Sequence, residues 1–301
     1  MLIKTGLDVD DVGRDYGFSV SMVIDNVSLS AEVRRHDYDR YLCALFAPRD
    51  RRTDLIALFA FNLELARLRE RVSAPILGQI RLTWWHETIE GVFDGRPRQH
   101  PIAQSLARLV SDYGLTRRMI EEMIHSRIKE FDENGFANIH ELESFAEQTS
   151  GALHQIGLEI LGVEQPAAIQ AARHVGVAWA LVGFCRSVPY HARRRRLYLP
   201  QDLLASENLS PNSVMSMTDG MRLRPIIAAI DTLAMEHLTA ARLLKPHVPE
   251  RALPVLLPAI LAARYSCDLR RWDCNPFALQ EETTPILRQL RLIWASWRKS
   301  Y

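Results

Sequence analysis

The chain has 301 residues, of which 48% are hydrophobic and 24% are charged, and its formal net charge is +1. This composition is ordinary for a folded globular protein and excludes a largely disordered chain. The small net charge excludes nucleic acid as the expected partner, because no global field attracts a polyanion.

The N-terminal residues 1–29 are mixed in character and weakly periodic, so we expect an arm followed by one helical domain over residues 30–301. The start of the chain shows neither a signal peptide nor a transit peptide, which favours a cytoplasmic protein. No stretch of eighteen uncharged apolar residues occurs, so we expect no membrane-spanning helix.

Helix signals begin at residue 30. Ser30 can cap a helix that starts "AEVRRHDYDRYLCALF", and Pro48 separates it from a second helix that we expect to run to Pro75. In the second helix apolar residues recur at helical spacing, at Leu58, Phe61, Leu65, Leu68 and Val72. The following segment repeats the pattern with Ile80, Trp84, Thr88 and Val92.

Further helices are expected to the end of the chain. Thr116 opens one, and Asn138 with Glu141 resembles a capping box at the start of another. The segment "AAIQAARHVGVAWALVGFCRSV" is apolar nearly all round, so it should lie centrally. Three more helical patterns follow, and no alternating strand pattern occurs. The sequence therefore predicts an all-α protein of about ten helices.

The cysteines are Cys43, Cys185, Cys267 and Cys274, and none of them forms a C-x-x-C pair. A disulfide framework or a zinc site is therefore not indicated, and we expect reduced, buried thiols. His86, His154, His174 and His191 show no ligand spacing with a cysteine or an acid, so no metal site is predicted from them.

Four separated segments carry a family resemblance: "ALFAFN", "IRLTWWHETIEGVFDGRPRQHP", "EFDENGFANIHELESFAEQTSG" and "RRRRLYLPQDLL". Over about residues 41 to 277 the chain resembles the squalene/phytoene synthase family. The resemblance implies an isoprenoid synthase fold, with helices around a central cavity. Active members of that family condense prenyl diphosphates, using Mg²⁺ held by two acidic motifs on facing helices. Carboxylates four residues apart on a helix point the same way, which suits such a site.

This chain departs from the family pattern at both motifs. The acidic positions of the first fall on Ala66, Arg67 and Glu70, and those of the second on Ser187 and His191. An arginine about 4 Å from a dication costs about 8 kcal/mol at an effective dielectric of about 20. We therefore expect no catalytic residue, no metal site and no cofactor.

Within the family, "AFNLELARLRERVS" and "SVPYHARRRRLYLPQDL" are similar to the branch that contains mitochondrial complex I assembly factor 6. That resemblance implies a non-catalytic role in assembly of respiratory complex I in a bacterial relative. Its implied partner is a membrane subunit of that complex or an assembly intermediate. We expect the ligand of such a protein to be a quinone tail, another lipid or isoprenoid, or a partner helix. We expect it in the cytoplasm, attached peripherally to the inner face of the cell membrane.

Several arginines are candidates for binding a diphosphate or an anionic head group. They are Arg67, Arg186, Arg193, Arg194, Arg195 and Arg196, together with Tyr198. The alternative is that Arg67, Arg69 and Arg71 pair with Glu64 and Glu70, and that the run of arginines is a solvated turn. Both interpretations stay open at the level of sequence.

Two further alternatives remain. An active Mg²⁺-dependent prenyltransferase would need unusual ligands, such as Glu64, Glu70 and Asp132. The C-terminal segment "ILRQLRLIWASWRKS" is amphipathic and basic, so it either packs on the domain or touches an anionic membrane surface.

Overall fold

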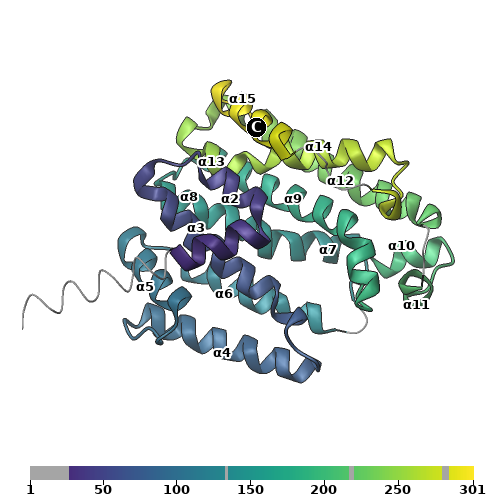
Figure 1. Ribbon diagram of the computed structural model, residues 1–301, viewed down its shortest axis with the longest axis horizontal. Helices are drawn as coiled ribbons and strands as arrows, with labels where there is room; N and C mark the ends of the chain where they lie inside the picture. Colours follow the sequence, from purple (N-terminus) through teal and green to yellow (C-terminus); the bar gives the residue numbers. More distant parts are fainter. Residues whose placement is uncertain (1–26, 133–134, 217–219, 280–284) are drawn as a thin grey trace, which may run out of the picture.

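Figure 1 shows the computed structural model, which describes residues 27–132, 135–216, 220–279 and 285–301. Across these residues every regular element is a helix, so the all-α prediction is confirmed. The expected arm lies mostly outside the described residues, although residues 27–29 are already helical and Leu29 is buried.

After a first helix over residues 27–36, the α-helices are α2 (Tyr38–Ala44), α3 (Arg49–Ala66), α4 (Pro75–Phe93), α5 (Pro101–Tyr113), α6 (Arg117–Ser126), α7 (Ile139–Ala146), α8 (Ala152–Leu161), α9 (Pro166–Arg193), α10 (Gln201–Ser206), α11 (Pro211–Met215), α12 (Arg224–Leu243), α13 (Leu253–Leu256), α14 (Pro258–Arg271) and α15 (Pro285–Trp297). Two 3₁₀ segments, η1 (Leu68–Glu70) and η2 (Arg127–Phe131), and a π-helical segment, η3 (Glu147–Gly151), bear on the site and the core.

The central helix is α9, which packs against α12, α14, α8 and α7. In Figure 1 it runs between a group formed by α4, α5 and α6 and a group formed by α13, α14 and α15. Its side chains are buried around much of its circumference, including Ala171, Val175, Leu181 and Cys185 at 0% exposure. The prediction of a central apolar helix is confirmed.

Among the residues that the structure describes, two helical stretches are long and apolar enough to cross a bilayer, namely α9 and Glu250–Arg271. However, 61% and 67% of their most apolar windows are buried inside the protein. Burial of this kind is typical of core helices that are hydrophobic on all sides.

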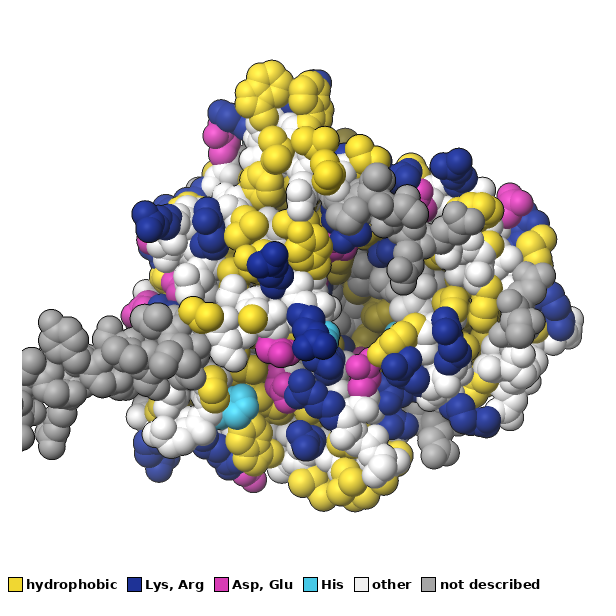
Figure 2. All heavy atoms as spheres, viewed as in Figure 1, with side chains coloured by type: hydrophobic (Ala, Val, Ile, Leu, Met, Phe, Trp, Pro, Cys, Tyr) yellow, Lys and Arg dark blue, Asp and Glu magenta, His cyan; other side chains and the backbone are white. Residues whose placement is uncertain are grey.

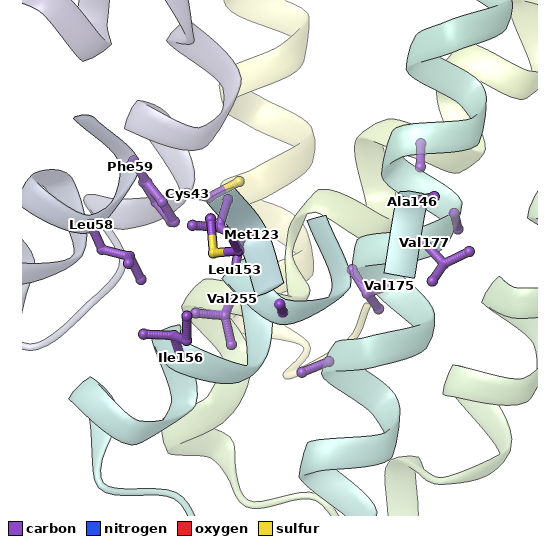
Figure 3. Packing of buried hydrophobic residues seen from close by; sticks show 14 of the residues in the cluster. Cys43, Leu58, Phe59, Met123, Ala146, Leu153, Ile156, Val175, Val177 and Val255 are labelled. Carbon is purple, nitrogen blue, oxygen red and sulfur yellow. The ribbon is translucent and has the colours of Figure 1, made fainter. Parts of the chain in front are cut away.

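The apolar stripe of α3 joins the α4–α6 group to the core. Leu58, Phe61, Leu65 and Leu68 are fully buried, and the ring of Phe61 meets the edge of Trp85 with centroids 5.4 Å apart. Around them the interior is filled by side chains from several helices, as Figure 3 shows for Leu58, Phe59, Met123, Leu153, Ile156 and Val255. A Cβ atom at Gly157 would lie 2.7 Å from Val255, so packing between α8 and α13 is close.

Four local predictions were wrong. Ser30 is no cap, because the first helix is already under way at residue 27 and the next one starts anew, with Asp37 at its N-cap. α3 ends at Ala66, well before Pro75, and Pro75 instead starts α4.

The buried residues of α4 also differ from those that the sequence predicted. Ile80 is 58% exposed, and the core side of α4 carries Leu82, Trp85, Thr88, Ile89 and Val92. Cys43 and Cys185 are buried free thiols as expected, whereas Cys267 is exposed. Each error reflects packing by distant segments, which periodicity does not report.

Asn138 caps α7 as predicted, since its side chain accepts a hydrogen bond from the amide of Glu141 at 2.9 Å. The reciprocal bond differs from a standard capping box, because the Glu141 carboxylate accepts from the amide of Ala137 instead. The helix that Asn138 begins continues through η3 into α8, and η3 lies against α9.

That contact between η3 and α9 gives a matched pair of predictions. A Cβ atom at Gly176 would lie 2.5 Å from the carbonyl oxygen of Ser150, whereas a Cβ atom at Gly183 on the same helix meets nothing within 4 Å. We expect Gly176→Ala to lower the free energy of unfolding by about 1–3 kcal/mol through overpacking. Gly183→Ala should raise it by about 0.5–1 kcal/mol, because alanine favours a helix interior over glycine. Urea unfolding followed by circular dichroism measures both, and equal effects of the two changes would contradict the assignment.

Candidate functional site

The two motif regions that the sequence singled out meet in the structure. Tyr190 on α9 donates a hydrogen bond from its hydroxyl to Oε1 of Glu70 on η1, at 2.6 Å. The guanidinium of Arg196, just beyond α9, donates to the carbonyl oxygen of Arg69. Segments about 120 residues apart are therefore joined directly at the place where the family resemblance predicts facing motifs.

The first motif lies where the regular helix stops. Ala66 is the last residue of α3, Arg67 is its C-cap, and Glu70 ends η1. The backbone tightens into the 3₁₀ segment η1 here, and Leu68, its first residue, is fully buried. As a result the motif positions do not form one continuous α-helical face, which a paired-carboxylate site would require.

The two acids near this motif are paired with arginines. Arg71 lies 2.5 Å from Glu64, and Arg67 lies 3.9 Å from Glu70 and 3.8 Å from Glu32. Of the two interpretations of these arginines, pairing with neighbouring acids is therefore the one that holds for Arg67 and Arg71. Arg69 differs, because its guanidinium lies over the ring of Phe131 at 5.6 Å.

At the second motif, Ser187 uses its hydroxyl within the helix, donating to the carbonyl oxygen of Phe184 at 3.3 Å. His191 packs against Tyr198, with ring centroids 4.6 Å apart, and its buried Nδ1 has no hydrogen-bond partner. Burial, together with the positive charge of Arg196, lowers the pKa of His191 to about 4. The imidazole is therefore neutral at pH 7.

The residues at these positions do not fit Mg²⁺. The ion prefers a near-octahedral set of oxygen ligands. The motif positions offer one carboxylate, Glu70, which already accepts a hydrogen bond and lies beside Arg67. The other acid of the proposed alternative ligand set, Asp132, lies 3.0 Å from Lys129. Within the described part of the chain, no group of three or more His, Cys, Asp or Glu side chains is placed to hold a metal.

The arginine run does not form a single cluster. Arg186 stacks over Tyr265 at 3.6 Å, Arg194 lies over Tyr190 at 3.7 Å, and Arg193 donates to the carbonyl oxygen of Pro189 at 3.1 Å. The chain turns sharply after them, with Arg195 at a φ of 54°, in the left-handed region. The turn separates Arg195 and Arg196 from the arginines on α9.

Beyond this turn lies a pocket of about 350 Å³. Its polar lining includes Arg69, Lys129, Arg195, Arg196, Tyr198, Glu130 and Asp132. Four cations and two carboxylates line the pocket, and Lys129 pairs with Asp132 at 3.0 Å and with Glu141 at 2.8 Å, so the positive balance comes from the arginines. Of the predicted head-group residues, Arg195, Arg196 and Tyr198 line it, whereas Arg67, Arg186, Arg193 and Arg194 do not. Sequence reasoning missed Lys129, which only the fold brings to this place.

The charges in the pocket are partly offset by its own acids. Tyr198 donates from its hydroxyl to Glu130 at 2.9 Å, and the same carboxylate lies 2.8 Å from Arg127. Burial, and then the neighbouring positive charge of Arg69, lower the pKa of Arg196. Two like charges held together in a half-buried place are unfavourable, and an anion bound between them would relieve that repulsion.

Comparison with known proteins gives a consistent picture. The family model for squalene/phytoene synthase matches residues 33–297. NADH dehydrogenase (ubiquinone) complex I, assembly factor 6, from Homo sapiens is 34% identical over 271 residues, covering 89% of this chain and 81% of that protein. The Bos taurus protein of the same name matches over the same shares.

Among solved structures, a dehydrosqualene synthase superposes with a TM-score of 0.78 at 15% sequence identity. The match covers 93% of this chain and 99% of that one. It establishes the isoprenoid synthase fold, in agreement with the fold that the resemblance implied.

The neutral state of His191 predicts how stability depends on pH. Because its folded pKa of about 4 lies below the ordinary value of 6.5, the unfolded chain binds the proton more readily. The neutral His191 therefore adds to the free energy of unfolding above pH 6.5, and this stabilisation is lost as the pH falls toward 4. His154 and His174, with pKa values lowered chiefly by burial to about 3 and about 4, act in the same direction.

We expect unfolding free energy to fall between pH 7.5 and pH 5, and to fall less steeply in His191→Gln. The difference should approach 2 kcal/mol, from about 1.4 kcal/mol per pH unit over about 1.5 units. Urea titrations at both pH values measure it, with the surface variant His86→Gln as the control. An unchanged slope in His191→Gln would show that His191 is not held neutral.

Proposed function

The chain belongs to the squalene/phytoene synthase family, and we propose that within it the protein acts in assembly of respiratory complex I without catalysing prenyl transfer. The proposal is supported by relatives named as complex I assembly factor 6, which align with most of the chain. Its partner in this role is a membrane subunit of the complex or an assembly intermediate that contains one.

The observation that carries the non-catalytic part is the bond between Glu70 and Tyr190. Glu70 is the one carboxylate left at the acidic motif positions, and a hydroxyl from the facing helix binds it. Arg67 stands beside it at a position that would have to face the metal. The protein's own side chains thus stabilise each other where a metal–diphosphate complex would need free oxygen ligands.

We further propose that the basic pocket binds the anionic head group of a lipid or isoprenoid. Arg69, Arg195 and Arg196 supply the positive charge, and Tyr198 supplies a hydroxyl. A bound phosphate would relieve the repulsion between Arg69 and Arg196, which lowers the pKa of Arg196 in the free protein. No metal or other cofactor takes part in this proposal. The expected location is the cytoplasm of a bacterium, with attachment to the inner face of its membrane.

The first test is turnover. Purified protein is incubated with Mg²⁺ and farnesyl or geranylgeranyl diphosphate, and diphosphate release is followed beside an authentic synthase. We expect no release above the protein-free rate. Release that disappears in Glu70→Gln would instead reveal an active prenyltransferase that uses Glu70 as a ligand, and would overturn the proposal. The substitution is well matched, because the amide oxygen can still accept from Tyr190 while the charge that Mg²⁺ needs is gone.

The second test is genetic. Membranes of a strain that lacks the gene should show reduced NADH:ubiquinone oxidoreductase activity, and the wild-type gene should restore it. Because we propose no catalysis, Glu70→Gln should restore the activity to the same level. Normal complex I activity in the deletion strain would contradict the assembly role.

A further inference from the structure

The C-terminal helix α15 carries large apolar side chains on its outer surface. Their exposed fractions are 65% for Ile286, 44% for Leu287, 53% for Leu290, 54% for Ile293, 56% for Trp294 and 74% for Trp297. In Figure 2 hydrophobic side chains form a projection at the top of the molecule, where Figure 1 places α15. We call these six residues the α15 face.

The α15 face is exposed although the helix itself is held in place. On the inner side Leu292 and Ala295 are 0% and 2% exposed. Arg288 lies 2.7 Å from Asp39 of α2, and beyond the helix the hydroxyl of Tyr301 donates to the carbonyl oxygen of Ala241 at 3.2 Å. The helix therefore has a fixed orientation, and its outward apolar side belongs to the folded protein.

The spacing of the outer residues places them on one side of the helix. Ile286, Leu290, Ile293 and Trp297 follow one another at intervals of four, three and four residues. Trp294 adjoins this line, and its ring centroid is 5.4 Å from that of Trp297. A continuous apolar surface that ends in two exposed tryptophans is unusual on a protein that has no partner.

Most charges close to the α15 face are positive, although Arg288 and Lys299 pair with Asp39 and Glu250 of other elements. Residues 285–301 contain Arg288, Arg291, Arg298 and Lys299, and neither Asp nor Glu. The guanidinium of Arg298 lies 5.4 Å from the ring centroid of Trp294. Arg291 and Arg298 also line a hollow of about 410 Å³ beside Trp294, and Lys245 at the end of α12 completes its basic lining.

We propose that the α15 face docks on an anionic membrane surface, with its tryptophans at the level of the lipid head groups and the flanking cations on the lipid phosphates. Tryptophan suits this boundary because its ring is apolar and its N–H is polar. Arginine suits it because its aliphatic stem packs on apolar groups while its charged end stays in water. An apolar ridge flanked by cations is the arrangement that binds lipid interfaces.

The geometry favours lying on the membrane over crossing it. α15 has 13 residues. At about 1.5 Å per residue a helix of this length reaches about 20 Å, less than the hydrocarbon thickness of about 30 Å. Its inner side already packs against α14 and is joined to α2 through Arg288 and Asp39, so only the outer side is available. The α15 face shares no residue with the basic pocket, and the proposal does not depend on the role in complex I assembly.

The test is flotation of the full chain with vesicles of phosphatidylcholine, alone or with about 30% phosphatidylglycerol. We expect wild-type protein to float with the anionic vesicles. The double variant Trp294→Gln/Trp297→Gln should lower the partition coefficient at least ~10-fold, because both rings leave the interface. Glutamine is a good helix former, and both positions are exposed, so the fold is kept.

A matched control removes exposed apolar side chains elsewhere. Ile76→Gln/Ile80→Gln changes two residues of α4 that are 59% and 58% exposed, and it should leave flotation unchanged. The charges are tested with Arg298→Gln, which should weaken binding to anionic vesicles more than to neutral ones. Raising the salt from about 0.1 M to about 0.5 M should act in the same direction, because it screens exposed charges.

Three results would overturn the proposal. Wild-type protein could fail to float with either vesicle, or the tryptophan variant could float as well as wild type. Alternatively, size-exclusion chromatography could show a dimer that the tryptophan variant abolishes while vesicle binding is absent. The α15 face would then be a contact between two copies of the chain.

Discussion

The structure depends on the burial of one long helix, α9, on nearly all sides. Burial on this scale requires partners all round, and α7, α8, α12 and α14 supply them. At Gly176 the approach is so close that backbone meets backbone, since even a Cβ atom would lie 2.5 Å from a carbonyl oxygen of η3. Because α9 is fixed so firmly, its C-terminal end has a defined position, and this end carries Ser187, Tyr190 and His191 to the site.

The same constraint explains how the fold can persist when the acidic motifs are lost. The core side of α3 and η1 is made by Leu58, Phe61, Leu65 and Leu68, none of which belongs to the acidic motif positions. Replacing motif acids by Ala66 and Arg67 leaves that apolar stripe intact. What changes is the charge of the side chains where η1 meets the C-terminal end of α9. Where a metal would need carboxylates, Glu70 now accepts a hydrogen bond from Tyr190, and arginines occupy the surroundings. Fold and chemistry are carried by separate sets of residues here.

Sequence reasoning predicted the features that depend on periodicity over many residues. The all-α class, the central place of α9 and the buried stripe of α3 follow from repeated apolar spacing, which local packing does not overturn. It failed where one distant contact decides the outcome. α3 stops at Ala66 and the chain continues in the 3₁₀ segment η1, where Leu68 is fully buried, and no local signal marks that change. Likewise the burial of Leu82 and exposure of Ile80 depend on how α4 is rotated against α5 and α6.

The arginine run shows the same limit at the level of the site. Five arginines within eleven residues predict one positive cluster. In the structure, however, the guanidiniums of Arg186 and Arg194 stack on aromatic rings. Only Arg195 and Arg196 reach the pocket, because the chain turns through a left-handed residue between them and α9. There they meet Arg69 and Lys129, which come from other elements. The positive balance of this pocket is thus a product of tertiary structure, and it persists although the half-buried guanidiniums of Arg69 and Arg196 repel each other. A fold tolerates such repulsion more easily when an anion offsets it, so the pocket is a better place to seek a ligand than the motif positions around Glu70 and His191.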